Sequence, residues 1–174
     1  MAQATRPTSD RAREGLFSSL SSEFGTFAGL RVLDLFAGSG AIGLESLSRG
    51  ATLIHVVEKD EQAAKTIEAN YELVKKSNPA GKMQIFGMSV ERFLNDQPRE
   101  KYHLVYIDPP YDFSNQGVED ILSKLHDDNF LSSDAFIAVE RNTRSDQFIW
   151  PDAFIPARER NYGQASIYYG NFQP

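Results

Sequence analysis

Val32-Leu33-Asp34-Leu35-Phe36-Ala37-Gly38-Ser39-Gly40 is an apolar run that opens into a glycine loop, and Ala41-Ile42-Gly43 completes a GxGxxG pattern. Such a short run, rich in Val and Leu, is typical of a buried strand, and glycines let the backbone turn sharply into a helix. A strand, a glycine loop and a helix in this order commonly begin a fold that binds an adenosine-containing cofactor. The residues predict an α/β fold with a ligand site at this loop.

Short apolar runs alternate with helical periods on both sides of this loop, which indicates parallel strands joined by crossover helices. The strands expected to be parallel cover residues 32–36, 53–57, 83–86, 104–107 and 135–139. The expected helices are one capped by Thr8 or Ser9 with Leu16, Phe17 and Leu20 on one face, then 42–49, 61–76, 90–94 and 118–125. The apolar stretches 148–150, 154–155 and 165–169 are expected to be edge strands, with an antiparallel pair turning at Tyr162-Gly163-Gln164.

The bulk composition limits the possible classes of protein. A chain of 174 residues with 41% hydrophobic residues can bury one good core, so we expect a single domain over residues 1–174. There is no cysteine, which excludes disulfides and thiolate chemistry. No segment approaches the roughly 20 apolar residues of a membrane span, and the first residues lack the apolar centre of a signal peptide. We expect a cytoplasmic protein.

The charge is unevenly distributed along the chain. The net charge of −6 is unfavourable for a protein that binds nucleic acid, because Lys and Arg make the phosphate contacts. However, residues 1–31 and 141–174 each carry four arginines against three acids, and residues 32–140 carry the excess of acids. If a polyanion binds, the arginine-bearing ends should line its path; from charge alone, a generic acidic surface is an equally good interpretation.

Two carboxylates accompany the glycine loop. Glu58 follows the strand 53–57 at about the distance of the ribose-binding acid of dinucleotide folds, so NAD is one interpretation. Asp34 argues against NAD, because a carboxylate beside the loop would repel a pyrophosphate but attract the ammonium group of S-adenosylmethionine. We therefore predict S-adenosylmethionine as cofactor. Asp34 is assigned to its amino acid end and to ordering the loop, Glu58 to its ribose, and Ala37, Gly38, Ser39 and Gly40 to the loop that contacts it.

Asp108-Pro109-Pro110-Tyr111 follows the apolar run 104–107. Prolines and Asp also make ordinary turns, but here they end the strand expected beside the cofactor strand, where open parallel sheets bind ligands. The carboxylate of Asp108 and the carbonyl of Pro109 can accept both hydrogens of an exocyclic amine and turn its lone pair toward a methyl donor. Tyr111 can stack on a base swung out of its helix. No histidine base is required, and His55, His103 and His126 have no metal-ligand spacing, so no metal is expected.

Three motifs together resemble one family, the RsmD family of bacterial small-subunit (16S) ribosomal RNA guanine-N2 methyltransferases. They are residues 5–14 (TRPTSDRARE), Asp34-Leu35-Phe36-Ala37-Gly38-Ser39-Gly40 with residues 44–51 (LESLSRGA), and Asp108-Pro109-Pro110-Tyr111; the closing Arg160-Asn161-Tyr162-Gly163 also fits. The resemblance implies a Rossmann-like class I methyltransferase with a mostly parallel seven-stranded sheet and an antiparallel edge hairpin. It also implies a guanine of ribosomal RNA as target, within the small subunit or its assembly intermediate.

By the same resemblance, Arg6, Thr8, Asp10 and Arg13 belong to a segment that covers the active site and approaches RNA, and Arg6, Arg11 and Arg13 are expected to bind the RNA; a capped helix with exposed arginines is the alternative. Two departures stand out. Only Met1 to Ala4 precede the Thr-Arg-Pro motif, so the basic extension typical of the family is expected to be missing. Gly87-Met88-Ser89 stands where an acid or amide often recognises adenine, and Ser89 is expected to be a weak cofactor contact in its place.

The residues leave other functions open. Adenine N6 and a protein glutamine amide each offer a planar NH2 group to the same acceptors, although the enzymes that methylate them more often carry Asn at the position of Asp108. A binding module that keeps the cofactor pocket without catalysis, or a NAD-binding protein, belongs to a second class. The oligomeric state expected is a monomer.

Overall fold

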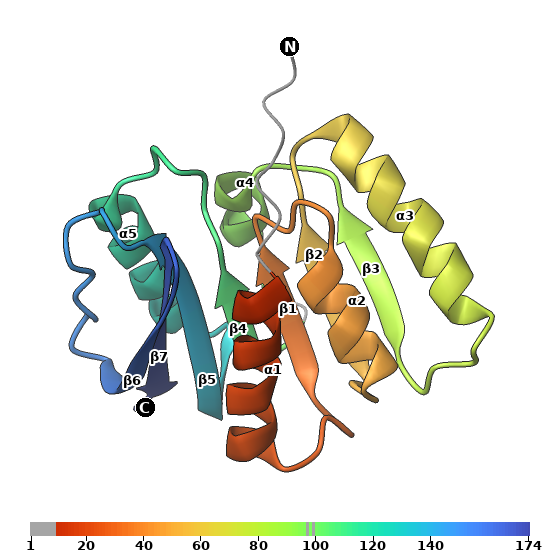
Figure 1. Cartoon of the computed structure of the whole chain (residues 1–174), viewed down its shortest axis with the longest axis horizontal. Coiled ribbons are helices and arrows are strands. Elements are labelled where there is room, and N and C mark those ends of the chain that lie inside the picture. The colour runs from red at the N-terminus through yellow and green to blue at the C-terminus, as the bar shows by residue number, and fades with distance from the viewer. Residues whose placement is uncertain (1–9, 97, 99) are drawn as a thin grey trace.

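The computed structural model describes residues 10–96, 98 and 100–174, and within them seven strands form one sheet (Figure 1). In chain order the elements are α1 (Asp10–Phe24), β1 (Arg31–Leu35), α2 (Ala41–Ser48), β2 (Leu53–Val57), α3 (Glu61–Lys75), β3 (Lys82–Phe86), α4 (Val90–Asn95), β4 (Tyr102–Ile107), α5 (Asn115–Asp127), β5 (Leu131–Asn142), β6 (Phe154–Tyr162) and β7 (Ala165–Phe172). The sheet order is β3-β2-β1-β4-β5-β7-β6. Neighbouring strands from β3 to β5 are parallel, and β7 is antiparallel to both β5 and β6. This is the Rossmann-like architecture that the sequence predicted.

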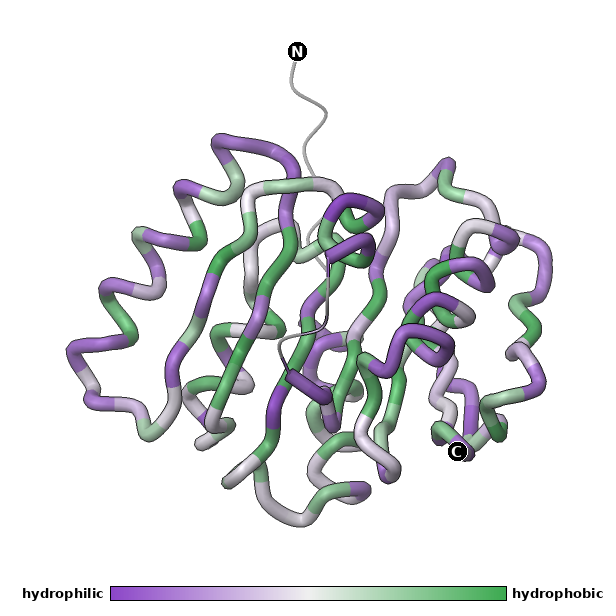
Figure 2. Tube along the Cα trace, turned by 180° about the vertical axis from the view of Figure 1, so that it is seen from behind, coloured by the Kyte–Doolittle hydropathy of each residue, from purple (hydrophilic) through white to green (hydrophobic). Residues whose placement is uncertain are grey.

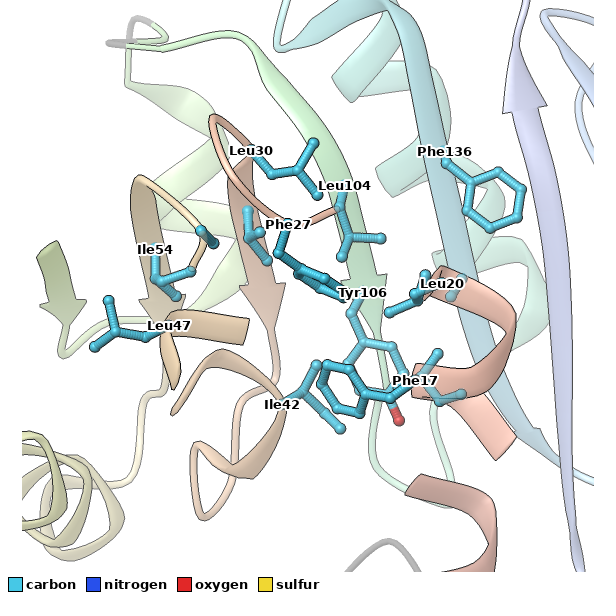
Figure 3. Close-up of a cluster of buried hydrophobic side chains, with 14 of the residues drawn as sticks. Phe17, Leu20, Phe27, Leu30, Ile42, Leu47, Ile54, Leu104, Tyr106 and Phe136 are labelled. Atoms are coloured by element: carbon cyan, nitrogen blue, oxygen red, sulfur yellow. The ribbon is translucent and has the colours of Figure 1, made fainter. Parts of the chain in front are cut away.

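Alternating side chains of the strands supply two hydrophobic cores, one on each face of the sheet. The first lies under α1, α2 and α3, and Figure 3 shows Phe17 and Leu20 of α1 facing Tyr106 and Phe136 of the sheet. The second lies under α4 and α5. In Figure 2 the strands in the middle are largely hydrophobic, whereas the surrounding helices alternate between hydrophobic and hydrophilic residues. A sheet covered on both faces explains the nearly continuous apolar runs of the sequence.

The helix α1 brings the N-terminal part of the chain into contact with β6, near its C-terminal end. It packs against β6, and a Cβ added to Gly15 would collide with the Tyr162 hydroxyl, so only glycine allows this contact. The second turn of α1 therefore lies beside Tyr162 at the end of β6. Thr8 and Ser9, predicted as caps of this helix, lie outside the described residues. In the part of the chain that the structure describes, no helix is both long and apolar enough to cross a membrane.

One expectation for the last third of the chain was wrong. Residues 148–150 form no strand; the Phe148 ring is buried and packs against Trp150 and Tyr168. Residues 165–169 belong to the expected antiparallel hairpin at this edge of the sheet, in which β6 is the outermost strand and β7 lies between β5 and β6. The physical reason is burial: Ile167 and Tyr169 of β7 enter the first core, whereas β6 is mostly exposed and takes the edge. The antiparallel pair itself, with its turn at 162–164, is confirmed.

Candidate active site

The carboxyl ends of β2, β1 and β4 lie side by side and bring the predicted motifs together. Leu35 is level with Val57 of β2 and with Ile107 of β4. The glycine loop after β1 consequently has Glu58 on one side and Asp108 on the other. This shared edge, where parallel sheets bind ligands, was the central spatial prediction, and the strand register confirms the placement of the backbone.

The loop after β1 turns through conformations that favour glycine. Phe36, Gly38 and Gly40 have φ angles of 57°, 58° and 74°. A Cβ on Gly40 would also approach the Ile67 side chain of α3 to 2.9 Å, so this glycine serves both the turn and close packing. The N–H of Ala37 donates to the carbonyl of Val57 at 3.0 Å and ties the loop to β2. The left-handed φ of Phe36, which is not glycine, is a local strain of the kind found at functional sites.

Asp34 is the buried carboxylate of this site. It is 1% exposed, and its Oδ2 accepts a hydrogen bond of 3.2 Å from the N–H of Gly43 in the first turn of α2. Because Gly40, the N-cap residue of α2, has no side chain to offer, Asp34 supplies this cap from the neighbouring strand. Burial raises the pKa of Asp34 to about 8; the hydrogen bond from Gly43 opposes this increase and the charge of Glu58 adds to it.

Glu58 follows β2 and is partly buried. Burial raises its pKa, against a lowering by the backbone hydrogen bond from Gly38. Its Oε2 and the Oδ1 of Asp34 are both buried and accept no hydrogen bond among the described residues. Such an unpaired acceptor is costly, and a bound ligand with N–H or O–H donors would satisfy it. The ammonium and ribose hydroxyls of S-adenosylmethionine are donors of this kind, so the residues present fit the cofactor. The assignment of Asp34 to the amino acid end, of Glu58 to the ribose and of residues 37–40 to the loop that contacts the cofactor stays a prediction.

Ser89 has a structural task that the sequence did not indicate. It is the N-cap residue of α4, and its hydroxyl accepts a hydrogen bond of 3.1 Å from the N–H of Arg92. It lies three residues after the end of β3 and is exposed, so its hydroxyl hydrogen can still be donated. Its role as a cofactor contact stays a prediction.

The segment after β4 places its residues in different environments. Pro109 is buried, Asp108 is partly buried, and Tyr111 is 75% exposed. The N–H of Phe113 donates to the carbonyl of Pro110 at 2.9 Å, which closes a turn around Tyr111. The Phe113 ring packs on Phe36 with the ring centroids 5.3 Å apart. The segment after β4 therefore touches Phe36, the first residue of the glycine loop after β1.

Two of the three predicted RNA-binding arginines, Arg11 and Arg13, lie in α1. Arg6 is outside the described residues, whereas Arg11 is exposed on α1. Arg13 is held by two acids, with Nη2 3.2 Å from Asp10 and Nε 3.8 Å from Glu45. Both arginines lie near the start of α1, and Arg13 reaches Glu45 of α2, the helix that follows the glycine loop. Their contact with RNA stays a prediction.

The histidines take part in the protein's own contacts. His55 is paired with the Tyr102 hydroxyl at 2.7 Å, and Nδ1 of His103 accepts the N–H of Arg31 at 3.0 Å. Among the described residues, no group of three or more His, Cys, Asp and Glu side chains could hold a metal ion.

Arg141 near the end of β5 was missed by the sequence analysis. It is only 7% exposed, and its Nε donates to Oδ1 of Asn115 at 2.9 Å while its Nη2 donates to the carbonyl of Phe113. A signal for it exists in the sequence: Glu140 and Arg141 directly follow the expected strand 135–139, at the same edge position that singled out Glu58 and Asp108. The rule that found those two acids would have indicated Glu140 and, as its immediate neighbour, Arg141.

This sheet order, the glycine loop flanked by Asp34 and Glu58, each with one buried oxygen that accepts no hydrogen bond among the described residues, and the acidic segment after β4 define an S-adenosylmethionine-dependent methyltransferase. The model of the family described as conserved hypothetical protein 95 matches residues 1–171. The chain belongs to this family, which is the RsmD family that its motifs resemble.

Individual relatives agree with this assignment. "Ribosomal RNA small subunit methyltransferase D" of Escherichia coli (strain K12) is 32% identical over 161 residues, which cover 92% of this chain and 76% of the relative. The protein of the same description from Haemophilus influenzae is 33% identical over 167 residues, covering 94% and 81%. Among solved structures, the "Putative methyltransferase yhhF from Escherichia coli" superposes with a TM-score of 0.83 at 28% identity, covering 97% of this chain and 90% of that one.

Proposed function

We propose that this protein methylates the exocyclic N2 amine of a guanine in small-subunit (16S) ribosomal RNA. The observation that carries the proposal is the position of Asp108 and Pro109, directly after β4 and beside the glycine loop after β1. The relatives described as small-subunit ribosomal RNA methyltransferases support RNA of the small subunit as the substrate.

The proposed mechanism follows from the acceptors at the end of β4. S-adenosylmethionine supplies, when bound, an electrophilic methyl group on its sulfonium. The amine of guanine is a poor nucleophile, since its lone pair is delocalised into the ring. The Asp108 carboxylate and the Pro109 carbonyl accept its two hydrogens, which turns the lone pair toward the cofactor crevice and stabilises the positive charge that develops on nitrogen. Asp108 or water takes the proton afterwards, since the methylated nitrogen is strongly acidic.

Tyr111 is proposed to hold the base. A methyl donor in a crevice cannot reach an amine inside a helical stack, so the guanine must be swung out. Tyr111 is 75% exposed and stands at the tip of the turn between Pro110 and Phe113. An exposed ring at this place can stack on the extruded base, and stacking on an aromatic side chain contributes about 1–3 kcal/mol per base.

The arginine-bearing ends of the chain are proposed to guide the RNA. The fold brings them to one edge: Arg11 on α1, Arg144 after β5 and Arg160 near the end of β6 are all exposed. The hairpin that follows Arg160 is bonded to the loop after β5, since the N–H of Thr143 donates to the carbonyl of Gln164 at 2.8 Å. We propose that the protein acts as a monomer in the cytoplasm, on the small subunit or its assembly intermediate.

The decisive experiment is mass spectrometry of nucleosides from ribosomal RNA of cells that lack this protein. We expect the loss of one N2-methylguanosine from the small-subunit RNA and its return when the gene is restored. Purified protein should transfer a methyl group to deproteinised or partly assembled small subunits. An unchanged nucleoside profile with transfer to free DNA would contradict the proposal, whereas N6-methyladenosine or methylated glutamine as product would identify one of the two rival substrates.

A further inference from the structure

The guanidinium of Arg141 is buried where two loops of the active-site edge meet. Arg141 is 7% exposed and lies near the end of β5, where it pairs with Ser166 of β7. One nitrogen donates to the side chain of Asn115 at the start of α5, and another to the backbone carbonyl of Phe113. Thus a single side chain of β5 grips the end of the segment that begins at Asp108.

Phe113 is fixed on three sides. Its carbonyl accepts from Arg141, its N–H donates to Pro110 at 2.9 Å, and its ring lies against Phe36 of the cofactor loop. The ring also fills the space above Gly117, where an added Cβ would be 2.5 Å from a ring carbon. The segment from Asp108 to Phe113 can therefore change its shape only if these contacts break.

Asp108 and Arg141 also act on each other through their charges. Burial lowers the pKa of the Arg141 guanidinium, and the negative charge of Asp108 opposes that change. A buried cation is costly unless its donors are bonded and a counter-charge is near. Both conditions are met by the two ends of one segment, Asp108 at its start and Phe113 with Asn115 at its end. An apolar side chain could fill the space but could not make these bonds.

We propose that Arg141 is a positioning residue that holds residues 108–115 in the shape in which Asp108 and Pro109 receive the target amine. The proposal rests on the proposed function for the identity of that amine. Arg141 itself is too buried to touch the RNA and acts through Phe113, Asn115 and Asp108. Asn115 extends the network, because its Nδ2 donates to the carbonyl of Asp146 at 2.8 Å and so connects the segment to the loop after β5.

The test compares Arg141→Met, Arg141→Lys and Asn115→Ala with the unmodified protein. Arg92→Met, an exposed arginine of α4 without a side-chain hydrogen bond among the described residues, is the matched control. We expect Arg141→Met to lower kcat at least tenfold, with the Kd for S-adenosylmethionine within twofold, since Asp34 lies in β1 and Glu58 in the loop after β2. Lysine keeps the charge but lacks the two-nitrogen fork, so it should recover only part of kcat. The Asn115→Ala change should cost less, and combining it with Arg141→Met should add nothing further, as expected for one network.

Amide exchange measured by NMR adds a readout that does not depend on activity. In Arg141→Met the amide of Phe113 should exchange at least tenfold faster. The amide of Ala37, which lies in the glycine loop and donates to the carbonyl of Val57 in β2, should keep its rate. A kcat within twofold of the unmodified protein, or unchanged exchange at Phe113, would overturn the proposal. If Arg141→Met does not fold, Asn115→Ala decides by the same two measurements. If the unmodified protein methylates no RNA, the proposed function fails, whereas the exchange rates still test the role of Arg141.

Discussion

At the scale of single residues, the two oxygens of the buried Asp34 carboxyl have different surroundings. One oxygen caps α2 through Gly43, and the other accepts no hydrogen bond among the described residues. With a pKa of about 8, the group is mostly protonated at neutral pH in the free protein. An ammonium ligand favours the ionised form, so its binding must release this proton.

The affinity for S-adenosylmethionine should therefore depend on pH. Below pH 8 the Kd includes the cost of deprotonating Asp34, so we expect binding to tighten between pH 6 and 8, by at most about tenfold per pH unit. Asp34→Asn should bind more weakly and lose this dependence. Calorimetry in two buffers of different ionisation enthalpy would measure the released proton directly. Equal affinities of the unmodified protein at pH 6 and pH 8 would contradict the assignment of Asp34 to the amino acid end.

The stability of the free protein should change with pH in the opposite direction. The Asp34 carboxyl titrates near pH 4 in an unfolded chain, that is at about its usual pKa, and at about 8 when folded. Between these values the folded state binds the extra proton, so the contribution of this group is complete below about pH 4 and is lost as the pH rises through 8. We expect the Tm to fall more between pH 5.5 and 8 than in Asp34→Asn. For a chain of this size each kcal/mol corresponds to roughly 2–4 °C. Parallel Tm curves for the two proteins would refute the buried, protonated carboxyl.

Asp108 should separate catalysis from cofactor binding. Replacing it by alanine removes one of the two acceptors proposed for the amine, and loss of a comparable polar stabiliser typically costs about 10²–10³ in kcat. The Kd for S-adenosylmethionine should stay within twofold, because Asp108 belongs to the segment after β4. Asp108→Asn keeps an acceptor oxygen and should retain more activity than the alanine variant. Equal losses of cofactor binding and of kcat in Asp108→Ala would contradict the assigned role.

At the scale of secondary structure elements, the sequence predicted the parallel part of the sheet well. The strand 53–57 was placed with its observed bounds, and the others differ mainly at their ends. These strands are covered on both faces, so their apolar runs are unambiguous. The last third was harder because Phe148 is buried in a loop, where its burial is set by tertiary contacts with Tyr168 and the partly buried Trp150 and not by a local period. The sequence also could not show that β7, the last strand of the chain, lies between β5 and β6 in the sheet.

Gly117 in the first turn of α5 offers a test in which activity should change more than stability. Alanine is favoured over glycine inside a helix by up to about 1 kcal/mol, and this gain opposes the cost of breaking the contact of the Phe113 ring with Phe36, so the Tm of Gly117→Ala should change little. The added Cβ would be 2.5 Å from the Phe113 ring and must displace it. We expect kcat to fall with little change in cofactor affinity. Gln116→Ala, an exposed neighbour in the same turn, is the control. An unchanged kcat in Gly117→Ala would mean that Phe113 need not stay in place.

At the scale of the whole molecule, one rule located most of the candidate site. Side chains that directly follow parallel strands meet at one edge, and this rule predicted from the sequence that Asp108, Glu58 and the glycine loop lie together. The rule could not supply the contacts between loops. The pairing of Phe36 with Phe113, and of Arg141 with Phe113 and Asn115, depends on which loops become neighbours after the sheet has formed. These contacts leave no periodic pattern in the sequence, because they depend on the order of the strands in the sheet.

The distribution of charge over the molecule leads to the last prediction. The acidic middle of the chain forms most of the sheet and its helices, whereas Arg11, Arg144 and Arg160 from the two ends are exposed at the edge of the candidate site. If RNA follows this edge, each arginine that contacts a phosphate releases counterions on binding, and its loss should reduce the salt slope of RNA affinity by up to about one. We expect the triple change of these arginines to glutamine to weaken binding and flatten its salt dependence, with the cofactor Kd unchanged. Lys82→Gln, at the opposite edge where β3 begins, should bind RNA as the unmodified protein does. An equal effect of Lys82→Gln would mean that the RNA is attracted by positive charge anywhere on the protein. It would then follow no path along the edge where the parallel strands end.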